Sequence, residues 1–429
     1  MNDGIGGYQT LLNFVATAPN HPRAAELLYQ AGEIAELGGR LAEAADTWKR
    51  VAADYPSFEH AQRALLLAGI SYYRLGDFAN ALAAFQKYLE NSTTLEERST
   101  AHFWQGKAYA AMGDTPAATS AWEMAASIDP TGYYSERAND ILRQRSPFTP
   151  TENIDLSYDL LGERTQAEEW IRTTFNLASD TELSSSTPLM SDLRFVRGNE
   201  LWELGLYEEA RDEFEDLRQA FASDPANSYR LANHLLELGF YRSAILSTRQ
   251  ILNLAGMSDL ETFNAPAYFN HIRFGTYFRD LILSAAQQAN FHPLMLFSIV
   301  RQESAFESFA SSSANARGLM QIIPATGSEL ATELGWPEDY SNNDLYRPMV
   351  SLTFGAHYLA KWRDYFGGDS YAALAAYNGG PGNAIEWKKL AQDDPDLFLE
   401  VIRFDETRDY IRRIYELFNI YRRIYDRTP

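Results

Sequence analysis

The sequence contains no cysteine, so disulfides, thiolate catalysis and thiolate metal ligands are all excluded. Histidine is scarce, and its seven copies lack the spacing of metal-binding motifs. His292, which directly precedes Pro293, is best explained as a residue at the start of a helix. We therefore expect neither a metal ion nor another cofactor.

Positive charge is also in short supply. The 429 residues include 37 Lys and Arg against 58 Asp and Glu, which gives a net charge of -21. Binding to nucleic-acid phosphates needs concentrated Lys and Arg, so a nucleic-acid partner is not expected. An acidic surface on a helical protein is most often simply a solvated face.

Long apolar runs are missing. No stretch approaches the roughly 20 apolar residues needed to span a bilayer, so we expect no transmembrane segment in this chain. The first residues, Met1 to Gly7, have neither a basic region nor an apolar core typical of a signal peptide. Composition leaves two locations open: the cytoplasm, or a compartment reached through a targeting segment that this sequence does not include.

Several catalytic motifs are absent as well. The glycine-rich stretch 379–382 is not followed by the Gly-Lys-Ser/Thr of a phosphate-binding loop. There is no Gly-x-Ser-x-Gly nucleophile elbow, and long apolar–polar alternation typical of strands does not occur. The absence of strand-like alternation favours an all-α, mostly helical fold.

What the sequence does contain is a repeat with a period of 37 residues. In each unit a Gly follows a hydrophobic helix end, an Ala stands five residues later, and a large aromatic stands four residues after that. The units are Gly39, Ala44, Trp48; Gly76, Ala81, Phe85; and Gly113, Ala118, Trp122. The Gly ends one helix, the Ala allows the next helix to approach closely, and the aromatic fills the space between them. This pattern resembles tetratricopeptide-like hairpins stacked into a solenoid, and weaker copies extend it over residues 24–255.

The repeat is interrupted at residues 146–188, where Ser- and Pro-rich stretches predict a bend between two arcs of the solenoid. Beyond about residue 256 the frame ends. Residues 271–429 are expected to form a compact, mostly helical domain.

One carboxylate stands where a helix pattern calls for an apolar residue. Pro293 suits the first turn of a helix, and Leu296, Ile299 and Val300 fall on one stripe. Glu303 is the next position of that stripe. The ordinary interpretation is a Glu at a helix end that turns to solvent. The functional interpretation is a carboxylic acid in apolar surroundings, whose desolvation raises its pKa until it can donate a proton near neutral pH.

Three further segments bear on that choice. Gly318 to Gln321 reads Gly-Leu-Met-Gln, 375–382 reads Ala-Ala-Tyr-Asn-Gly-Gly-Pro-Gly, and 404–410 reads Phe-Asp-Glu-Thr-Arg-Asp-Tyr. Together with Glu303-Ser304, and in this order, these segments resemble the soluble lytic transglycosylase family, whose catalytic domain is similar to goose-type lysozyme. The solenoid in front is similar to the helical superhelix of the family's large members. The resemblance implies TPR-like repeats at 1–145, a linker bend and a second set of repeats at 146–265, and a lysozyme-like catalytic domain at 266–429.

The resemblance also implies roles for individual residues. Glu303 matches the catalytic acid, and Tyr410 matches a tyrosine whose hydroxyl hydrogen-bonds that carboxylate. Glu406 and Arg408 match neighbours with structural roles or contacts to peptide stems. The implied substrate-binding residues are Ser304, Ser312, Met320, Gln321, Tyr377 and Asn378. This sequence departs from the family pattern at Gly379-Gly380, where many members have Ala-Gly, and we expect this change to be neutral. The triple serine 311–313 leaves the assignment of the substrate-binding serine open by one position.

An ordinary glycosidase needs two carboxylates. Glu307 is nearby, but one turn beyond the helix end we expect it to face solvent. A lytic transglycosylase manages with one carboxylate, because the substrate supplies the nucleophile. On this hypothesis Glu303 cleaves the MurNAc-β-1,4-GlcNAc bond of peptidoglycan as acid and then base, and 1,6-anhydro-MurNAc forms.

Two alternatives stay open. One is a muramidase of the same fold that uses water, and the other is a TPR scaffold with an inactive passenger domain. Glycan strands of peptidoglycan are the expected partner, and cell-wall proteins are further candidates for the repeats. Because peptidoglycan lies outside the cytoplasmic membrane, we expect a periplasmic, cell-envelope or extracellular location. We also expect the natural gene to encode an export signal or anchor that is absent here.

Overall fold

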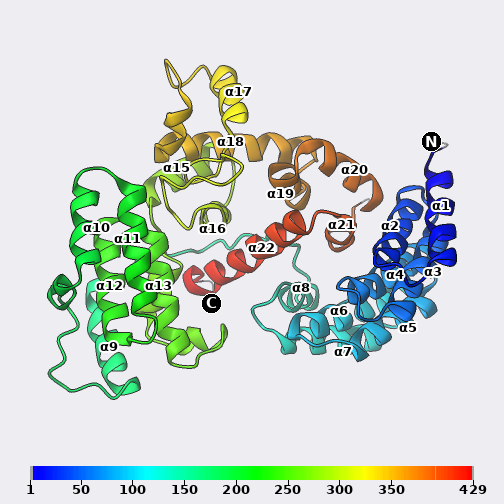
Figure 1. Ribbon diagram of the computed structural model, residues 1–429, viewed down its shortest axis with the longest axis horizontal. Coiled ribbons are helices and arrows are strands. Elements are labelled where there is room, and N and C mark those ends of the chain that lie inside the picture. The colour runs from blue at the N-terminus through cyan, green and yellow to red at the C-terminus, as the bar shows by residue number, and fades with distance from the viewer. Residues whose placement is uncertain (1–2, 392, 428–429) are drawn as a thin grey trace. The chain divides into compact units, whose positions relative to one another are not determined.

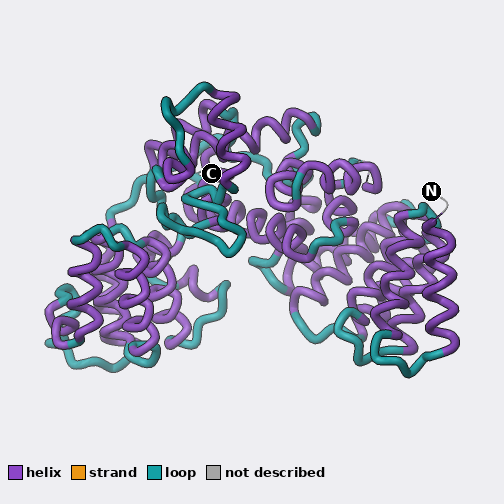
Figure 2. Tube along the Cα trace, turned by 45° about the horizontal axis from the view of Figure 1, so that its top comes forward, coloured by secondary structure: helices purple, strands orange, loops and turns teal. Residues whose placement is uncertain are grey.

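The computed structural model describes residues 3–391 and 393–427, and most of these residues lie in helices (Figure 2). The described residues form 22 α-helices and three short 3-10 helices, with isolated β-bridges but no strand. The expected all-α fold class is confirmed. The chain divides into two compact units: residues 1–149 with 387–408, and residues 150–386 with 409–429.

The first unit begins with eight helices, drawn in blue to cyan in Figure 1. Their bounds are α1 (Asp3–Thr17), α2 (Ala24–Leu37), α3 (Leu41–Asp54), α4 (Ala61–Leu75), α5 (Phe78–Glu90), α6 (Leu95–Ala111), α7 (Thr115–Ile128) and α8 (Tyr133–Leu142). Consecutive helices pack against one another throughout this series, as a stack of helical hairpins requires.

The repeating Gly and aromatic residues have the structural roles that the period predicts. Gly76 follows α4 with a φ of +74°, a left-handed conformation that ends the helix and favours glycine. Phe85 on α5 is fully buried and packs directly on Gly69 of α4, where an added Cβ would lie 2.3 Å from its ring. Gly32 and Gly106 face Trp48 and Trp122 in the same way, at the same spacing of 37 residues. A glycine on the first helix therefore completes each repeat, in addition to the alanine on the second.

The first unit also contains residues 387–408, which we call the strap. It contains α21 (Pro395–Val401), the end of α20 (Pro381–Ala391) and the start of α22 (Asp405–Tyr425). Four of its apolar side chains, Phe398, Leu399, Val401 and Ile402, have no exposed surface.

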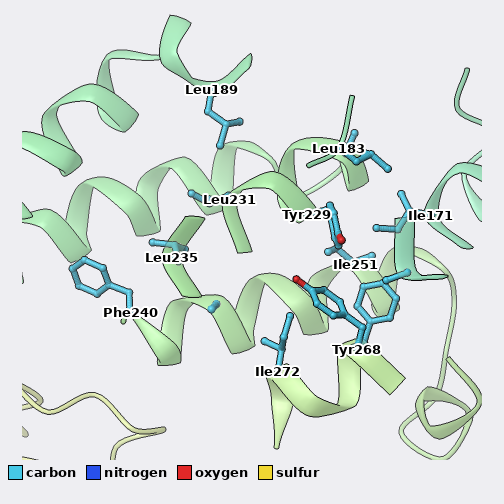
Figure 3. Packing of buried hydrophobic residues seen from close by; sticks show 14 of the residues in the cluster. Ile171, Leu183, Leu189, Tyr229, Leu231, Leu235, Phe240, Ile251, Tyr268 and Ile272 are labelled. Atoms are coloured by element: carbon cyan, nitrogen blue, oxygen red, sulfur yellow. The ribbon is translucent and has the colours of Figure 1, made fainter. Parts of the chain in front are cut away.

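The second unit begins with another set of helical hairpins. Their bounds are α9 (Leu160–Thr174), η1 (Thr187–Ser191), α10 (Leu193–Glu203), α11 (Tyr207–Ala220), α12 (Pro225–Leu238), α13 (Tyr241–Leu254), η2 (Glu261–Asn264) and α14 (Ala267–Arg273). Figure 3 shows part of their shared core, in which Tyr229 and Leu235 of α12, Ile251 of α13 and Tyr268 of α14 are all buried. The weaker copies of the repeat therefore also form packed hairpins.

The remaining helices of the second unit carry the site. Their bounds are α15 (Arg279–Gln288), α16 (Pro293–Glu303), α17 (Pro324–Leu334), η3 (Asn342–Tyr346), α18 (Pro348–Tyr365) and α19 (Ser370–Gly379), followed by most of α20 and of α22. Within the described ranges no helix is both long enough and apolar enough to cross a membrane. The three-part division at 145 and 265 stays a prediction. The two compact units are each built from separate stretches of the chain and do not test those boundaries.

Candidate active site

Helix α16 presents Glu303 at its last position. It begins as the sequence predicts: His292 is the N-cap, its Nδ1 accepts a hydrogen bond from the Leu294 amide at 3.3 Å, and Pro293 occupies the first turn. The predicted stripe of Leu296, Ile299 and Val300 is completely buried. Glu303 itself is half-buried, so the helix places a carboxylate at the edge of an apolar core.

The chain reverses directly after Glu303. Ala305 and Phe306 both have left-handed backbone angles, with φ of 50° and 67°. The buried Ser304 hydroxyl donates to the Leu319 carbonyl oxygen at 3.0 Å. This bond holds the Gly-Leu-Met-Gln segment against the end of α16.

Tyr410 of α22 contacts Glu303 directly. Its hydroxyl donates a hydrogen bond to Glu303 Oε1 at 2.5 Å, and its side chain is buried. Burial first, and the negative charge of Glu303 second, raise the pKa of Tyr410 well above its ordinary value. The phenol therefore keeps its proton and acts as a hydrogen-bond donor at neutral pH.

Tyr377 of α19 stands near the same carboxylate. Its hydroxyl donates to the Met320 carbonyl oxygen at 2.6 Å. Burial, followed by the charge of Glu303, raises its pKa well above the ordinary value, so this phenol also stays protonated. The Met320 amide in turn donates to Ser351 Oγ at 3.0 Å, and the Met320 side chain is fully buried. The Met320 backbone is thus fixed from both sides.

The loop that carries Gly318 and Gln321 has left-handed backbone angles at both residues. Gly318 has a φ of +73°, and an added Cβ would lie 1.9 Å from the Leu345 carbonyl oxygen. Gln321 also has a positive φ, of 48°, and its Nε2 donates to the carbonyl oxygens of Gly318 and Ala310. These bonds hold the Gln321 side chain in place.

A groove of about 490 Å³ opens beside Glu303. Four of the predicted site residues line it: Glu303, Ser304, Ser312 and Gln321. The remaining lining residues are Arg211, Arg242, Ile245, Leu246, Arg301, Gln302, Ala305, Glu307, Ala310, Ser311 and Arg413. A sugar-sized cleft next to a positioned carboxylate is suited to acid–base chemistry on a glycan.

The other predicted residues have different positions. Tyr410 contacts the site through its hydrogen bond to Glu303. Tyr377 and Met320 are hydrogen-bonded to each other, and Met320 directly precedes Gln321 of the groove. Asn378 is exposed near the end of α19 and is not part of the lining of the groove. Ser312 is exposed, and its hydroxyl accepts a hydrogen bond from the Ala316 amide at 3.1 Å.

The expectation that Glu307 faces solvent is wrong. Its side chain is 5% exposed, and its Oε2 lies 3.8 Å from Arg211 Nη1. Helix periodicity does not apply to Glu307, because the left-handed residues Ala305 and Phe306 turn the chain inward after α16. Burial raises the pKa of Glu307, and the charges of Arg211 and Arg242 act against this rise.

Sequence reasoning missed the arginines of the groove. Arg211 belongs to α11 and Arg242 to α13, both far from Glu303 in the sequence, and neither stands in a motif. Only the folded chain brings these two hairpins to the acid.

Residues 280–397 match the family described as Transglycosylase SLT domain. The chain carries an SLT domain. Residues 26–57, 61–133 and 195–248 match tetratricopeptide repeat families, so the predicted order of helical repeats followed by a transglycosylase domain is confirmed.

Named relatives match about a third of the chain or slightly more. The "Soluble lytic murein transglycosylase" of Salmonella typhimurium is 31% identical over 144 residues, which cover 33% of this chain and 22% of that protein. The protein of the same name from Escherichia coli K12 gives the same identity and the same coverage. The "Membrane-bound lytic murein transglycosylase C" of Haemophilus influenzae is 28% identical over 179 residues, 39% of this chain and 49% of that protein. The matched region spans less than a quarter of the soluble relatives and about half of the membrane-bound one.

A solved structure extends the likeness to nearly the whole SLT-containing chain. The inactive glutamate-to-glutamine mutant of lytic transglycosylase Slt from Pseudomonas aeruginosa superimposes with a TM-score of 0.65. The likeness covers 98% of this chain and 63% of that one at 22% sequence identity. It shows a shared fold.

Proposed function

We propose that this chain is a peptidoglycan lytic transglycosylase that cleaves MurNAc-β-1,4-GlcNAc bonds, with Glu303 as its acid and base. The observation that supports this most directly is the hydrogen bond from Tyr410 to Glu303 at the edge of the groove. It joins the last residue of α16, inside the SLT domain, to a tyrosine on α22.

The proposed reaction uses one carboxyl group twice. Protonated Glu303 gives its proton to the glycosidic oxygen as the bond to C1 of MurNAc breaks, and GlcNAc leaves as an alcohol. The N-acetyl group stabilises the positive charge that develops at C1. The Glu303 carboxylate then takes the proton of the MurNAc 6-hydroxyl, whose oxygen forms the new bond to C1. Atoms and charges balance without water, and the products are a free GlcNAc end and 1,6-anhydro-MurNAc.

Tyr410 and Tyr377 have different roles in the proposed reaction. Tyr410 donates to Glu303 Oε1, and this bond strengthens when Glu303 is ionised between the two proton transfers. Tyr377 holds the Met320 carbonyl oxygen and so fixes the loop that continues into Gln321. A charge-assisted hydrogen bond at the acid and a rigid loop beside it are both forms of preorganisation.

Substrate contacts follow from position. Ser312 and Gln321 line the groove and bind the glycan there, and Asn378 contacts it from the exposed end of α19. The Ser304 hydroxyl is committed to the Leu319 carbonyl oxygen and the Met320 side chain is fully buried, so both residues act on substrate through the backbone that they hold in place. The substrate places the protein in the cell envelope or outside the cell, and cell-wall proteins are candidate partners for the repeats.

The test is digestion of purified peptidoglycan by the wild type and by Glu303→Gln, followed by mass spectrometry of the products. We expect the wild type to release muropeptides one water lighter than their reducing counterparts, and Glu303→Gln to release none. Glu338→Gln, which changes an exposed carboxylate in the same domain, is the matched control and should digest normally. Reducing MurNAc ends would instead identify a muramidase, and an inert wild type would identify a scaffold with an inactive domain.

A further inference from the structure

The strap, residues 387–408, carries acidic side chains that are buried against the N-terminal repeats of its own unit. Asp396 is 3% exposed, and both its oxygens accept from Arg137 of α8, at 2.8 Å from Nε and 3.2 Å from Nη2. Lys107 of α6 donates to Asp396 at 3.1 Å and to both oxygens of Asp394 at 2.8 and 3.0 Å. Two strap carboxylates are therefore held by cations of two successive hairpins.

Glu400 is the most deeply placed acid of the strap, with no exposed surface. Its carboxylate accepts hydrogen bonds from Arg63 of α4, Trp104 of α6 and Tyr134 of α8. Arg63 also donates to the Glu400 carbonyl oxygen at 3.1 Å. Three different hairpins thus meet at one strap side chain.

In one further contact the strap supplies the cation and the repeats supply the acid. Arg403 of the strap pairs with Glu36 of α2, which is 1% exposed. Arg74 of α4 donates to the other oxygen of Glu36 at 2.5 Å. Glu36 is a buried acid on the repeat side, and the strap cation Arg403 pairs with it.

We call Glu36, Arg63, Arg74, Lys107 and Arg137 the repeat face. All five stand on the first helix of a hairpin: α2, α4, α6 or α8. Arg63 and Arg137 are 74 residues apart, which is two periods of 37, so they occupy the same position of the repeat. The position between them is Thr100, and Arg74 and Lys107 occupy other positions of the repeat, so the period of 37 alone does not generate these cations.

Buried charges make this docking specific. A buried ion pair adds little net stability over an apolar contact of the same shape, but a buried charge that loses its partner is strongly unfavourable. A strap that slipped by one residue would leave Asp396 and Glu400 uncompensated, although its apolar side chains could still be buried. The charge pattern thus fixes one register of the strap on the repeat face.

The strap leads directly into the helix that carries Tyr410. Helix α22 begins at Asp405, two residues after Arg403, and Tyr410 follows five residues later, roughly 7.5 Å further along the helix axis. The position of the first turn of α22 depends on where the strap is held. Tyr410 lies in the second turn of the same continuous helix, Asp405–Tyr425.

We propose that the repeat face is a receptor for the strap, and that the docked strap positions Tyr410 for its hydrogen bond to Glu303. The N-terminal repeats are on this view a positioning element of the catalytic site. The surface of their first helices is filled by the chain's own acidic segment rather than by glycan. The effect on catalysis rests on the proposed function, but the docking itself does not.

The test uses the full chain with Asp396→Asn and Glu400→Gln combined, which removes two charges and keeps side-chain size. We expect amide hydrogen exchange of residues 394–403 to become about tenfold faster or more, because the strap opens locally. The matched control is Glu26→Gln with Glu90→Gln, which removes two charges from exposed ion pairs in the same unit. The control should leave exchange in the strap unchanged.

Catalysis supplies the second measurement. In the strap double variant we expect kcat on glycan strands to fall about tenfold with little change in KM. We also expect the high-pH limb of the kcat profile to move up, as we expect for Tyr410→Phe. The strap variant combined with Tyr410→Phe should be no slower than Tyr410→Phe alone, since both changes break the same hydrogen bond. If the double variant does not fold, Asp394→Asn is used, because Asp394 is only partly buried.

Three results would overturn the proposal: unchanged exchange in the strap, faster exchange with an unaltered kcat profile, or losses that add to those of Tyr410→Phe. Failure of the proposed function is recognised separately, as a wild type that releases no anhydro products. The exchange measurement needs no substrate and still decides whether the charges hold the strap.

Discussion

Tyr410 donates a 2.5 Å hydrogen bond to Glu303 across 107 residues of sequence. It connects the end of α16 with the second turn of α22, and both groups are shielded from water to a large degree. A donor fixed in this way favours the ionised form of the carboxylate without having to move during the reaction.

Removal of that donor should therefore change the pH dependence of the reaction. In Tyr410→Phe the ionised form of Glu303 loses a hydrogen bond, so the acid form persists to higher pH. We expect kcat to fall about 10- to 100-fold at neutral pH and its high-pH limb to shift upward. Initial rates of anhydro-muropeptide release from pH 4 to 9 measure both effects. A lower rate with an unmoved limb would mean that Tyr410 acts on folding alone.

Tyr377 should matter for stability as well as rate. In Tyr377→Phe the Met320 carbonyl oxygen loses its partner in a buried setting, which costs about 1–3 kcal/mol of unfolding free energy. Urea unfolding measures this loss, and kcat should fall with it because the loop that carries Gln321 loosens. Tyr365→Phe, at a tyrosine that is 62% exposed, is the control and should unfold like the wild type. Equal midpoints for the two variants would contradict the prediction.

The sequence predicts those parts of the site that local rules determine. The start of α16 follows from His292 and Pro293, and the position of Glu303 follows from the period of the buried stripe. Glu307 was mispredicted because left-handed residues, which periodicity does not reveal, turn the chain between it and the helix.

The parts of the fold and the site that the sequence does not predict depend on contacts between residues far apart in the chain. The docking of the strap on the repeats pairs charges such as Asp396 and Arg137 that are 259 residues apart, and no local pattern marks them as partners. The same holds for Arg211, which reaches the groove from another hairpin. Side-chain contacts between distant helices depend on the packing of the whole unit, which residue spacing along the sequence does not encode.

Asp396 should make the protein sensitive to acid. Burial alone would raise its pKa, but Arg137 and Lys107 outweigh burial and lower the pKa to about 2. A carboxylate with a lowered pKa adds stability that is complete above its unfolded pKa near 4 and is lost as the pH falls through 2. The shift corresponds to about 2–3 kcal/mol. Urea unfolding from pH 7 to pH 2 should show this loss in the wild type.

Asp396→Asn should be destabilised at pH 7 and lose less stability on acidification. The exposed pair variant Glu90→Gln serves as the control and should follow the wild-type curve. Parallel curves for Asp396→Asn and the wild type would show that this ion pair does not contribute to the pH dependence.

Glu307 should affect the pH dependence of stability in the opposite direction to Asp396. Burial raises its pKa above the ordinary value, so the folded chain binds its proton more tightly than the unfolded chain does. Its carboxylate then costs stability above its folded pKa, and that cost disappears as the pH falls below the ordinary value of about 4.3. Glu307→Gln, which keeps the shape and removes the charge, should be more stable than the wild type at pH 7. At pH 4 the two proteins should approach each other in unfolding free energy. A variant less stable than the wild type at pH 7 would mean that the attraction to Arg211, at 3.8 Å, outweighs the cost of burial.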